Sequence, residues 1–77
     1  MYLSDLIREI VTQKLRETCI GKTVSFSGEE CGDQVILCKD VYFTDDDGNC
    51  WIVFIDQEGN EYYADGRGID IYFEILD

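Results

Sequence analysis

Cysteines and carboxylates are the side chains of this 77-residue chain that could do chemistry, because it contains no histidine. Cys19, Cys31, Cys38 and Cys50 are separated by 12, 7 and 12 positions. No pair has the close Cys-x-x-Cys spacing of a zinc site, so we predict free thiols. Cys38 and Cys50 lie in apolar runs and should be buried. Two disulfides, or one zinc ion held by four scattered thiolates, are the alternatives.

An aspartate triplet at 45–47, followed by Gly48, resembles part of a calcium-binding loop. Such a loop needs acidic oxygens at positions 1, 3 and 5, Gly at position 6 and Glu at position 12. With Gly48 at position 6, position 1 is Phe43 and position 12 is Phe54. The pattern therefore predicts an exposed hairpin turn, with weak cation binding as the alternative.

Catalytic groups are scarce in the chain. It offers no histidine as a general base, and most of its acidic residues stand in turn-like positions where solvent keeps them ionised. Gly66-Arg67-Gly68 lacks the further glycine and lysine of a phosphate-binding loop, so we expect Arg67 to pair with a nearby carboxylate. We predict that the protein is not an enzyme and that it needs no cofactor and no metal.

The net charge of −11 is concentrated in one part of the chain. Residues 1–22 hold four basic and three acidic side chains, whereas residues 23–77 hold two basic and 14 acidic ones. A region with a charge of −12 repels phosphate and attracts basic surfaces, so direct binding to nucleic acid is disfavoured. The alternative is that the acidity serves only solubility.

Most of the acidic residues lie in or beside predicted turns. Carboxylates spaced on a rigid scaffold can imitate the phosphates of a nucleic acid, and an adjacent tyrosine can anchor the contact. In a meander alternate turns project from the same end, so we expect the 28–33 loop to lie beside the 56–61 turn. The candidate partner-binding residues are Asp45, Asp46, Asp47, Asp56, Glu58, Glu61, Tyr62 and Asp65.

A helix over residues 4–19 is the first element that we predict. Ser4 is a suitable N-cap, and Gly21 follows the expected end. Apolar residues recur at helical spacing and should pack on the sheet as one stripe, although a helix that docks on a partner is the alternative. The stripe consists of Leu3, Leu6, Ile7, Ile10, Val11 and Leu15.

Five strands should follow, at about 22–27, 34–44, 50–55, 61–64 and 69–76. The third is apolar throughout and should be covered on one face by the helix. The polar pair Lys39-Asp40 interrupts the second strand and predicts a bend or bulge there. We predict one α+β domain over 1–77, in which the helix packs on a five-stranded antiparallel meander. A more specific prediction is that the sheet forms a small SH3-like or Sm-like barrel.

Two short stretches resemble one protein family. Ser4-Asp5-Leu6-Ile7-Arg8-Glu9-Ile10 is similar to the opening helix of small acidic phage-encoded anti-CRISPR proteins, which inhibit a nuclease by DNA mimicry. Glu58-Gly59-Asn60-Glu61-Tyr62 resembles their acidic hairpin turn, which enters the DNA-binding surface of the nuclease. The resemblance implies that Glu58, Asn60 and Glu61 contact the partner. In the second half the sequence departs from the family, with tyrosine-rich strands in place of further helices.

These observations favour a non-enzymatic inhibitor that blocks the nucleic-acid-binding groove of a basic partner such as a CRISPR nuclease. The alternative is a small structural module that assembles with itself or within a larger complex, through exposed aromatic residues such as Tyr42 or Tyr72. The sequence has no apolar stretch long enough to cross a membrane, and we expect no signal peptide, because residues 3–17 are amphipathic and carry acidic side chains. We therefore expect a cytoplasmic protein, located in the host cell if a phage encodes it.

Overall fold

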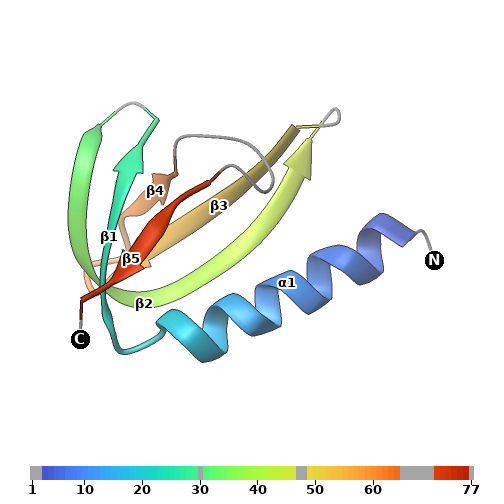
Figure 1. The fold of residues 1–77 in the computed structure, drawn as a ribbon, viewed down its shortest axis with the longest axis horizontal. Coiled ribbons are helices and arrows are strands. Elements are labelled where there is room, and N and C mark those ends of the chain that lie inside the picture. Colours follow the sequence, from blue (N-terminus) through green and yellow to red (C-terminus); the bar gives the residue numbers. More distant parts are fainter. Residues whose placement is uncertain (1–2, 30, 47–48, 65–70, 77) are drawn as a thin grey trace.

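The computed structural model describes residues 3–29, 31–46, 49–64 and 71–76. One helix precedes five antiparallel strands, which confirms the α+β fold class (Figure 1). The helix and the first four strands lie within two residues of their predicted bounds, whereas the fifth strand begins only at Phe73. The elements are α1 (Leu3–Cys19), β1 (Thr23–Gly28), β2 (Gly32–Asp46), β3 (Asn49–Asp56), β4 (Glu61–Tyr63) and β5 (Phe73–Ile75).

The strand order in the sheet is β4-β3-β2-β1-β5. Strands β1 to β4 form the predicted meander, but β5 returns to β1, where Phe73 lies opposite Phe26. The sheet also curls, because the Glu29 N–H donates to the Tyr63 carbonyl at 2.8 Å and Gly28 bridges to Ala64. The sheet is not closed, so the SH3-like or Sm-like barrel stays a prediction.

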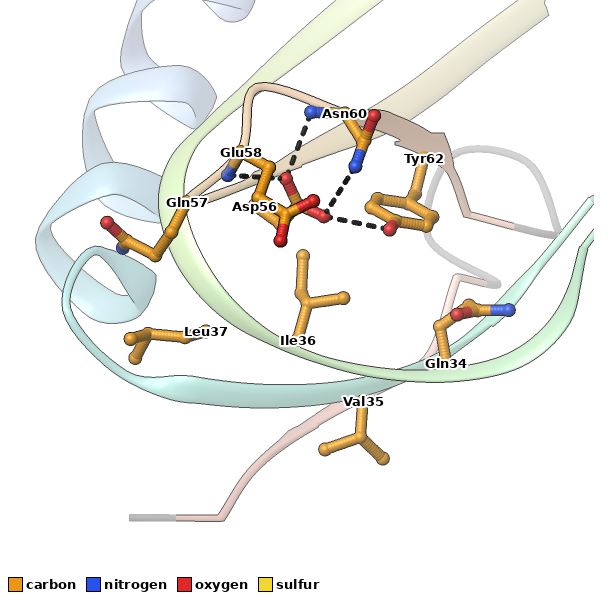
Figure 2. A pocket seen from close by; sticks show the side chains of 9 residues that line it. All are labelled: Gln34, Val35, Ile36, Leu37, Asp56, Gln57, Glu58, Asn60 and Tyr62. Atoms are coloured by element: carbon orange, nitrogen blue, oxygen red, sulfur yellow. Dashed lines mark hydrogen bonds between the residues drawn. The ribbon is translucent and has the colours of Figure 1, made fainter.

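A bulge divides β2 into two halves with different partners. The register with β3 steps from Cys38↔Asp56 to Asp40↔Ile55, so Lys39 is the extra residue, at the position that the sequence predicted. Before the bulge β2 pairs with β1, and after it β2 pairs with β3. Each half of β2 therefore has one edge without a strand beside it among the described residues; the first half faces the turn after β3 there (Figure 2).

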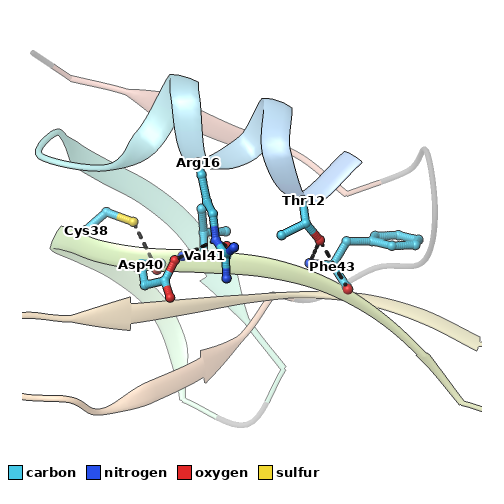
Figure 3. Close-up of polar contacts among 6 residues, drawn as sticks. All are labelled: Thr12, Arg16, Cys38, Asp40, Val41 and Phe43. Atoms are coloured by element: carbon cyan, nitrogen blue, oxygen red, sulfur yellow. Dashed lines mark hydrogen bonds and ion pairs between the residues drawn. The ribbon is translucent and has the colours of Figure 1, made fainter. Parts of the chain in front are cut away.

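Helix α1 covers the open edge of the second half of β2 (Figure 3). The Thr12 hydroxyl accepts the Phe43 N–H at 3.0 Å and donates to the Phe43 carbonyl at 3.5 Å. Arg16 Nε donates to the Val41 carbonyl at 3.2 Å and to the Asp40 carboxylate at 2.9 Å. Side chains of the helix thus satisfy backbone groups that a neighbouring strand would otherwise bind.

The core lies inside the curled sheet and extends to the C-terminal half of α1. Phe26 and Phe54 stack with ring centroids 4.5 Å apart, and Phe73 meets Phe54 edge to face. Cys19 and Cys38 are free and fully buried, and burial raises the pKa of the Cys38 thiol to about 11. The prediction that Cys38 is a buried apolar side chain is therefore confirmed, while the Cys50 side chain lies outside the described residues.

The outer face of β3 is not covered by the helix, contrary to our expectation. The helix packs on β2, and Val53 on β3 is fully buried between its cross-strand neighbours Tyr42 and Tyr63. Because residues directly opposite on adjacent strands share a face, the two aromatic rings supply the cover that we assigned to α1.

The apolar residues of α1 form two separate faces of the helix rather than one stripe. At 100° per residue, the mean directions of the two sets of apolar residues differ by about 130° around the helix axis. One set, consisting of Val11, Leu15 and Cys19, packs into the core. The other set is solvent-exposed, contrary to the prediction that it packs on the sheet. Its members are Leu3, Leu6, Ile7 and Ile10.

A pair of Thr→Val variants tests the contact between α1 and the edge of β2. Thr12→Val removes the hydroxyl that binds both backbone groups of Phe43, so we expect the free energy of unfolding to fall by about 1–2 kcal/mol. Thr18→Val is the matched control, because its exposed hydroxyl binds only the Lys14 carbonyl within the helix. Urea denaturation measures the free energy of unfolding of both variants. Equal stabilities of the two variants would show that the hydroxyl of Thr12 does not hold the helix against β2.

Candidate functional site

The turn between β3 and β4 is built around the Asp56 carboxylate (Figure 2). Its oxygens accept the backbone N–H groups of Glu58 and Asn60, each at 2.9 Å. They also accept the Asn60 amide at 3.2 Å and the Tyr62 hydroxyl at 2.8 Å. Gly59 closes the turn with φ +87°, a left-handed conformation that favours glycine. One side chain therefore fixes the whole turn.

These hydrogen bonds shift the pKa values of the Asp56 carboxyl and the Tyr62 phenol. Partial burial of Asp56 opposes its ionisation, but the bonds donated by Tyr62, Asn60 and Glu58 outweigh it and hold the pKa of the carboxyl below its usual value. The bond to Asp56 raises the pKa of the Tyr62 phenol in turn. At neutral pH the pair therefore consists of a carboxylate and a protonated phenol that donates to it.

Glu61 takes part in a second hydrogen bond between a tyrosine and a carboxylate. The Tyr42 hydroxyl donates to the Glu61 carboxylate at 3.1 Å, across β3. Burial and this carboxylate raise the pKa of the Tyr42 phenol. Tyr42 is half-buried, so it is not the exposed aromatic residue that the assembly alternative required, whereas Tyr72 is 73% exposed.

The predicted contact residues of this turn divide into two groups. Asp56, Asn60 and Tyr62 are bound to one another, so their polar groups serve the turn itself. Glu58 is exposed, and its carboxylate has no hydrogen bond or ion pair with any described residue. Glu58, with the exposed Glu61 beside it, is therefore the part of the turn that can meet a partner.

The other predicted contact residues lie elsewhere. Asp45 and Asp46 end β2, in register with Cys50 and Asn49. Because β3 runs from Asn49 to Asp56, this end of the hairpin is about 23 Å from the Asp56 turn at 3.3 Å per residue. The side chains of Asp45 and Asp46 lie outside the described residues, as do Asp47 and Asp65 altogether.

The 28–33 loop does not lie beside the 56–61 turn, contrary to the expectation from a flat meander. Glu29 binds Tyr63, at the far end of β4 from the turn. Asp56 lies opposite Cys38, six residues along β2 from Gly32. The curl of the sheet and the unequal strand lengths therefore separate the acidic turns instead of gathering them at one end.

A hollow of about 410 Å³ lies between the Asp56 turn and the first half of β2 (Figure 2). Residues 34–37 line one side of it, and residues 56–58 with Asn60 and Tyr62 line the other. Sequence reasoning missed this hollow, because it arises where β3 ends while β2 continues. The exposed Val35 and Leu37, at alternate positions of a strand, were the signal available for it.

Two features are absent from the described part of the chain. No group of three or more Cys, Asp or Glu side chains there could hold a metal ion. None of its helices is long and apolar enough to cross a membrane. Comparisons of the chain with protein-family models, with curated proteins and with solved structures give no match.

Asp56→Asn should destabilise the protein at neutral pH, because one oxygen that accepts hydrogen bonds is lost. Since the folded pKa of Asp56 lies below the unfolded one, its contribution is present above about pH 4 and is lost as the pH falls through the folded value. The difference in urea midpoint from wild type should therefore shrink in acid.

Glu58→Gln is the matched control for this variant, because it removes the same charge from the same turn without removing a hydrogen bond of the carboxylate. We expect its urea midpoint to equal or exceed that of wild type, since the net charge of −11 becomes less negative. If Asp56→Asn and Glu58→Gln were equally stable at neutral pH, Asp56 would not organise the turn.

Proposed function

We propose that this chain is a non-enzymatic acidic binding protein that occupies the nucleic-acid-binding groove of a basic partner, such as a CRISPR nuclease. The partner's groove would be filled by carboxylates in place of phosphates, and the protein would act in the cytoplasm of the host cell. The resemblance of residues 4–10 and 58–62 to anti-CRISPR proteins suggests this partner class.

The observation that carries the proposal is the excess of negative charge on the strands and on the turns between them. Among the described residues from Thr23 onward Lys39 is the one cation, while at least five carboxylates are exposed. Such a surface attracts a basic groove, speeds association and rejects nucleic acid. The exposed carboxylates of the described strands and turns are Glu29, Asp33, Glu58, Glu61 and Glu74.

The Asp56 turn supports the proposal in a second way. Because Asp56 binds two backbone N–H groups of the turn, the Glu58 backbone is held in one position before any partner arrives. A carboxylate on a preorganised backbone loses less conformational entropy on binding than one on a mobile loop. The turn can therefore offer Glu58 and Glu61 to spaced cations at a low ordering cost.

Charge-reversal variants test this proposal against a panel of purified CRISPR nucleases. We expect Glu58→Lys/Glu61→Lys, or a Lys triple variant at 45–47, to weaken binding at least about tenfold. Duplex DNA should compete with the wild-type protein, and its affinity should fall steeply with salt.

Glu9→Lys/Glu17→Lys on α1 is the matched control, because it changes the net charge by the same amount as the double variant of the turn. It should bind within about twofold of wild type if the acidic turns make the contact. The proposal fails if both turn variants bind as tightly as wild type, or if the control loses as much affinity as they do.

A self-assembling module is the second candidate function, and the exposed apolar face of α1 favours it. Leu3 and Ile10 are 71% and 61% exposed, with Leu6 and Ile7 between them. The helix carries three acidic and three basic residues, so it is the neutral part of an acidic protein. Two copies could therefore pair through α1 with less repulsion than through their sheets.

Sedimentation velocity over a range of concentrations tests this second candidate. If α1 forms the interface, Ile10→Ser should weaken self-association about tenfold, the effect of removing one well-buried apolar side chain from it. Ile20→Ser is the control, because Ile20 is also exposed but lies after the end of α1. A protein that is monomeric at every concentration and salt tested would exclude self-assembly.

A further inference from the structure

Within the described part of the chain, the first half of β2 has a strand on one side only. Residues Gly32 to Leu37 pair with β1, while β3 ends at Asp56, opposite Cys38. Among the described residues no strand follows Asp56 along that edge, and the hollow beside the Asp56 turn occupies its place. An open edge of this kind is able to accept a further strand.

The direction of the backbone groups follows from the register. The Cys38 N–H donates to the Lys22 carbonyl, so the backbone of Cys38 faces β1. In an antiparallel pair the direction alternates from one residue to the next. The N–H groups of Val35 and Leu37, and the Val35 carbonyl, therefore point away from β1 towards the hollow. Backbone groups of this kind bind an extended peptide by main-chain hydrogen bonds.

The side chains around this edge select a class of peptide. Val35 and Leu37 are 62% and 48% exposed and offer apolar contacts beside the free backbone groups. The lining of the hollow includes the carboxyl groups of Asp56 and Glu58 and contains no Lys or Arg. The Glu58 carboxylate also has no hydrogen bond or ion pair with another described residue. The edge therefore combines main-chain hydrogen bonding with uncompensated negative charge.

We propose that this edge of β2 is a peptide-binding site, which takes an extended segment of a partner protein that carries Lys or Arg at alternate positions. The segment would add as a strand beside Val35 and Leu37, with its cations towards the Asp56 turn. This site does not depend on the proposed function, because the segment could belong to any basic protein.

A second copy of this chain fits the site less well. Each copy carries a net charge of −11, so two sheets repel each other. The described edge strands β4 and β5 carry Glu61 and Glu74 and no basic residue. Either strand would bring a further carboxylate to an edge that already lacks cations. A basic segment of a partner protein would supply cations for the negative charge and main-chain hydrogen bonds for the backbone groups of the edge.

Three peptides of about eight residues, the length of an ordinary strand, provide the test. One alternates Lys and Val, the second alternates Glu and Val, and the third is the Lys-Val peptide N-methylated at alternate residues. We expect the Lys-Val peptide to bind, and the other two to bind at least about tenfold more weakly, since one loses the charge match and the other the main-chain bonds.

Amide hydrogen exchange measured by NMR locates the bound peptide. Without peptide, Ile36 should exchange slowly, because its N–H faces β1, whereas Val35 and Leu37 should exchange fast. The Lys-Val peptide should slow exchange at Val35 and Leu37. Binding that leaves both amides unprotected would overturn the proposal, because it would show attraction to the acidic surface without strand addition.

Two variants of Val35 separate backbone from side-chain effects. Val35→Pro removes an N–H that β1 does not use, so the fold should persist while the Lys-Val peptide binds about tenfold more weakly. Val35→Thr keeps the N–H and the β-branched shape, so binding should stay within about twofold. Equal affinity of the Pro and Thr variants would overturn the proposal.

Two further outcomes would also overturn the proposal. One is binding of neither Lys-Val nor Glu-Val peptide, and the other is protection of Val35 that rises with protein concentration in the absence of peptide, which would assign the edge to a second copy. Neither outcome affects the nuclease experiment, in which duplex DNA competes for the partner. Failure of this site and failure of the proposed function are therefore distinguishable.

Discussion

One constraint shapes this protein: the backbone N–H and C=O groups of one long strand need hydrogen-bond partners. β2 runs over 15 residues, which is longer than any strand that pairs with it. At the bulge at Lys39 the partner of β2 changes from β1 to β3, so among the described residues neither half of β2 has a strand on both edges. Thr12 and Arg16 of α1 cover the edge of the second half, since buried backbone groups need partners. The first half keeps its open edge, and the hollow lies there.

Some acidic side chains of this protein hold its turns and its bulge, and others give the surface its negative charge. Asp56 looks like a solvated turn residue, yet its carboxylate accepts four hydrogen bonds and fixes the β3–β4 connection. Asp40 accepts from both Arg16 and the Val41 N–H beside the bulge. The oxygens of such carboxylates are already occupied by donors within the protein, so they are less able than unbound carboxylates to accept hydrogen bonds from a partner. The number of carboxylates that can act as phosphate mimics is therefore smaller than the net charge suggests.

Three surfaces of this small protein differ in chemistry. The strands and turns present carboxylates, the far face of α1 presents Leu3, Leu6, Ile7 and Ile10 without net charge, and the edge of β2 presents backbone groups beside Val35 and Leu37. An acidic surface favours fast, salt-sensitive association, whereas an apolar helix face favours salt-insensitive contacts. The edge of β2 combines charge with main-chain bonding. Each surface therefore makes a distinct prediction for salt, peptide and self-association measurements.

Sequence patterns alone determined much of the fold. The change from helical to alternating spacing after Gly21 placed α1 and the first four strands, and the polar pair Lys39-Asp40 placed the bulge. These features are local, because spacing and turn chemistry act over a few neighbouring residues. The acidic balance and the candidate turn residues could be read in the same way.

Tertiary structure decided which residues meet. Phe73 pairs with Phe26, the Asp56 turn lies beside the middle of β2, and only one of the two apolar faces of α1 packs into the core. The hydrogen bonds of Asp56 reach only two to six residues along the chain, so the turn itself is local. Its place beside the middle of β2 depends on the curl of the sheet and on where each strand ends. Those follow from packing between segments that are far apart in the chain.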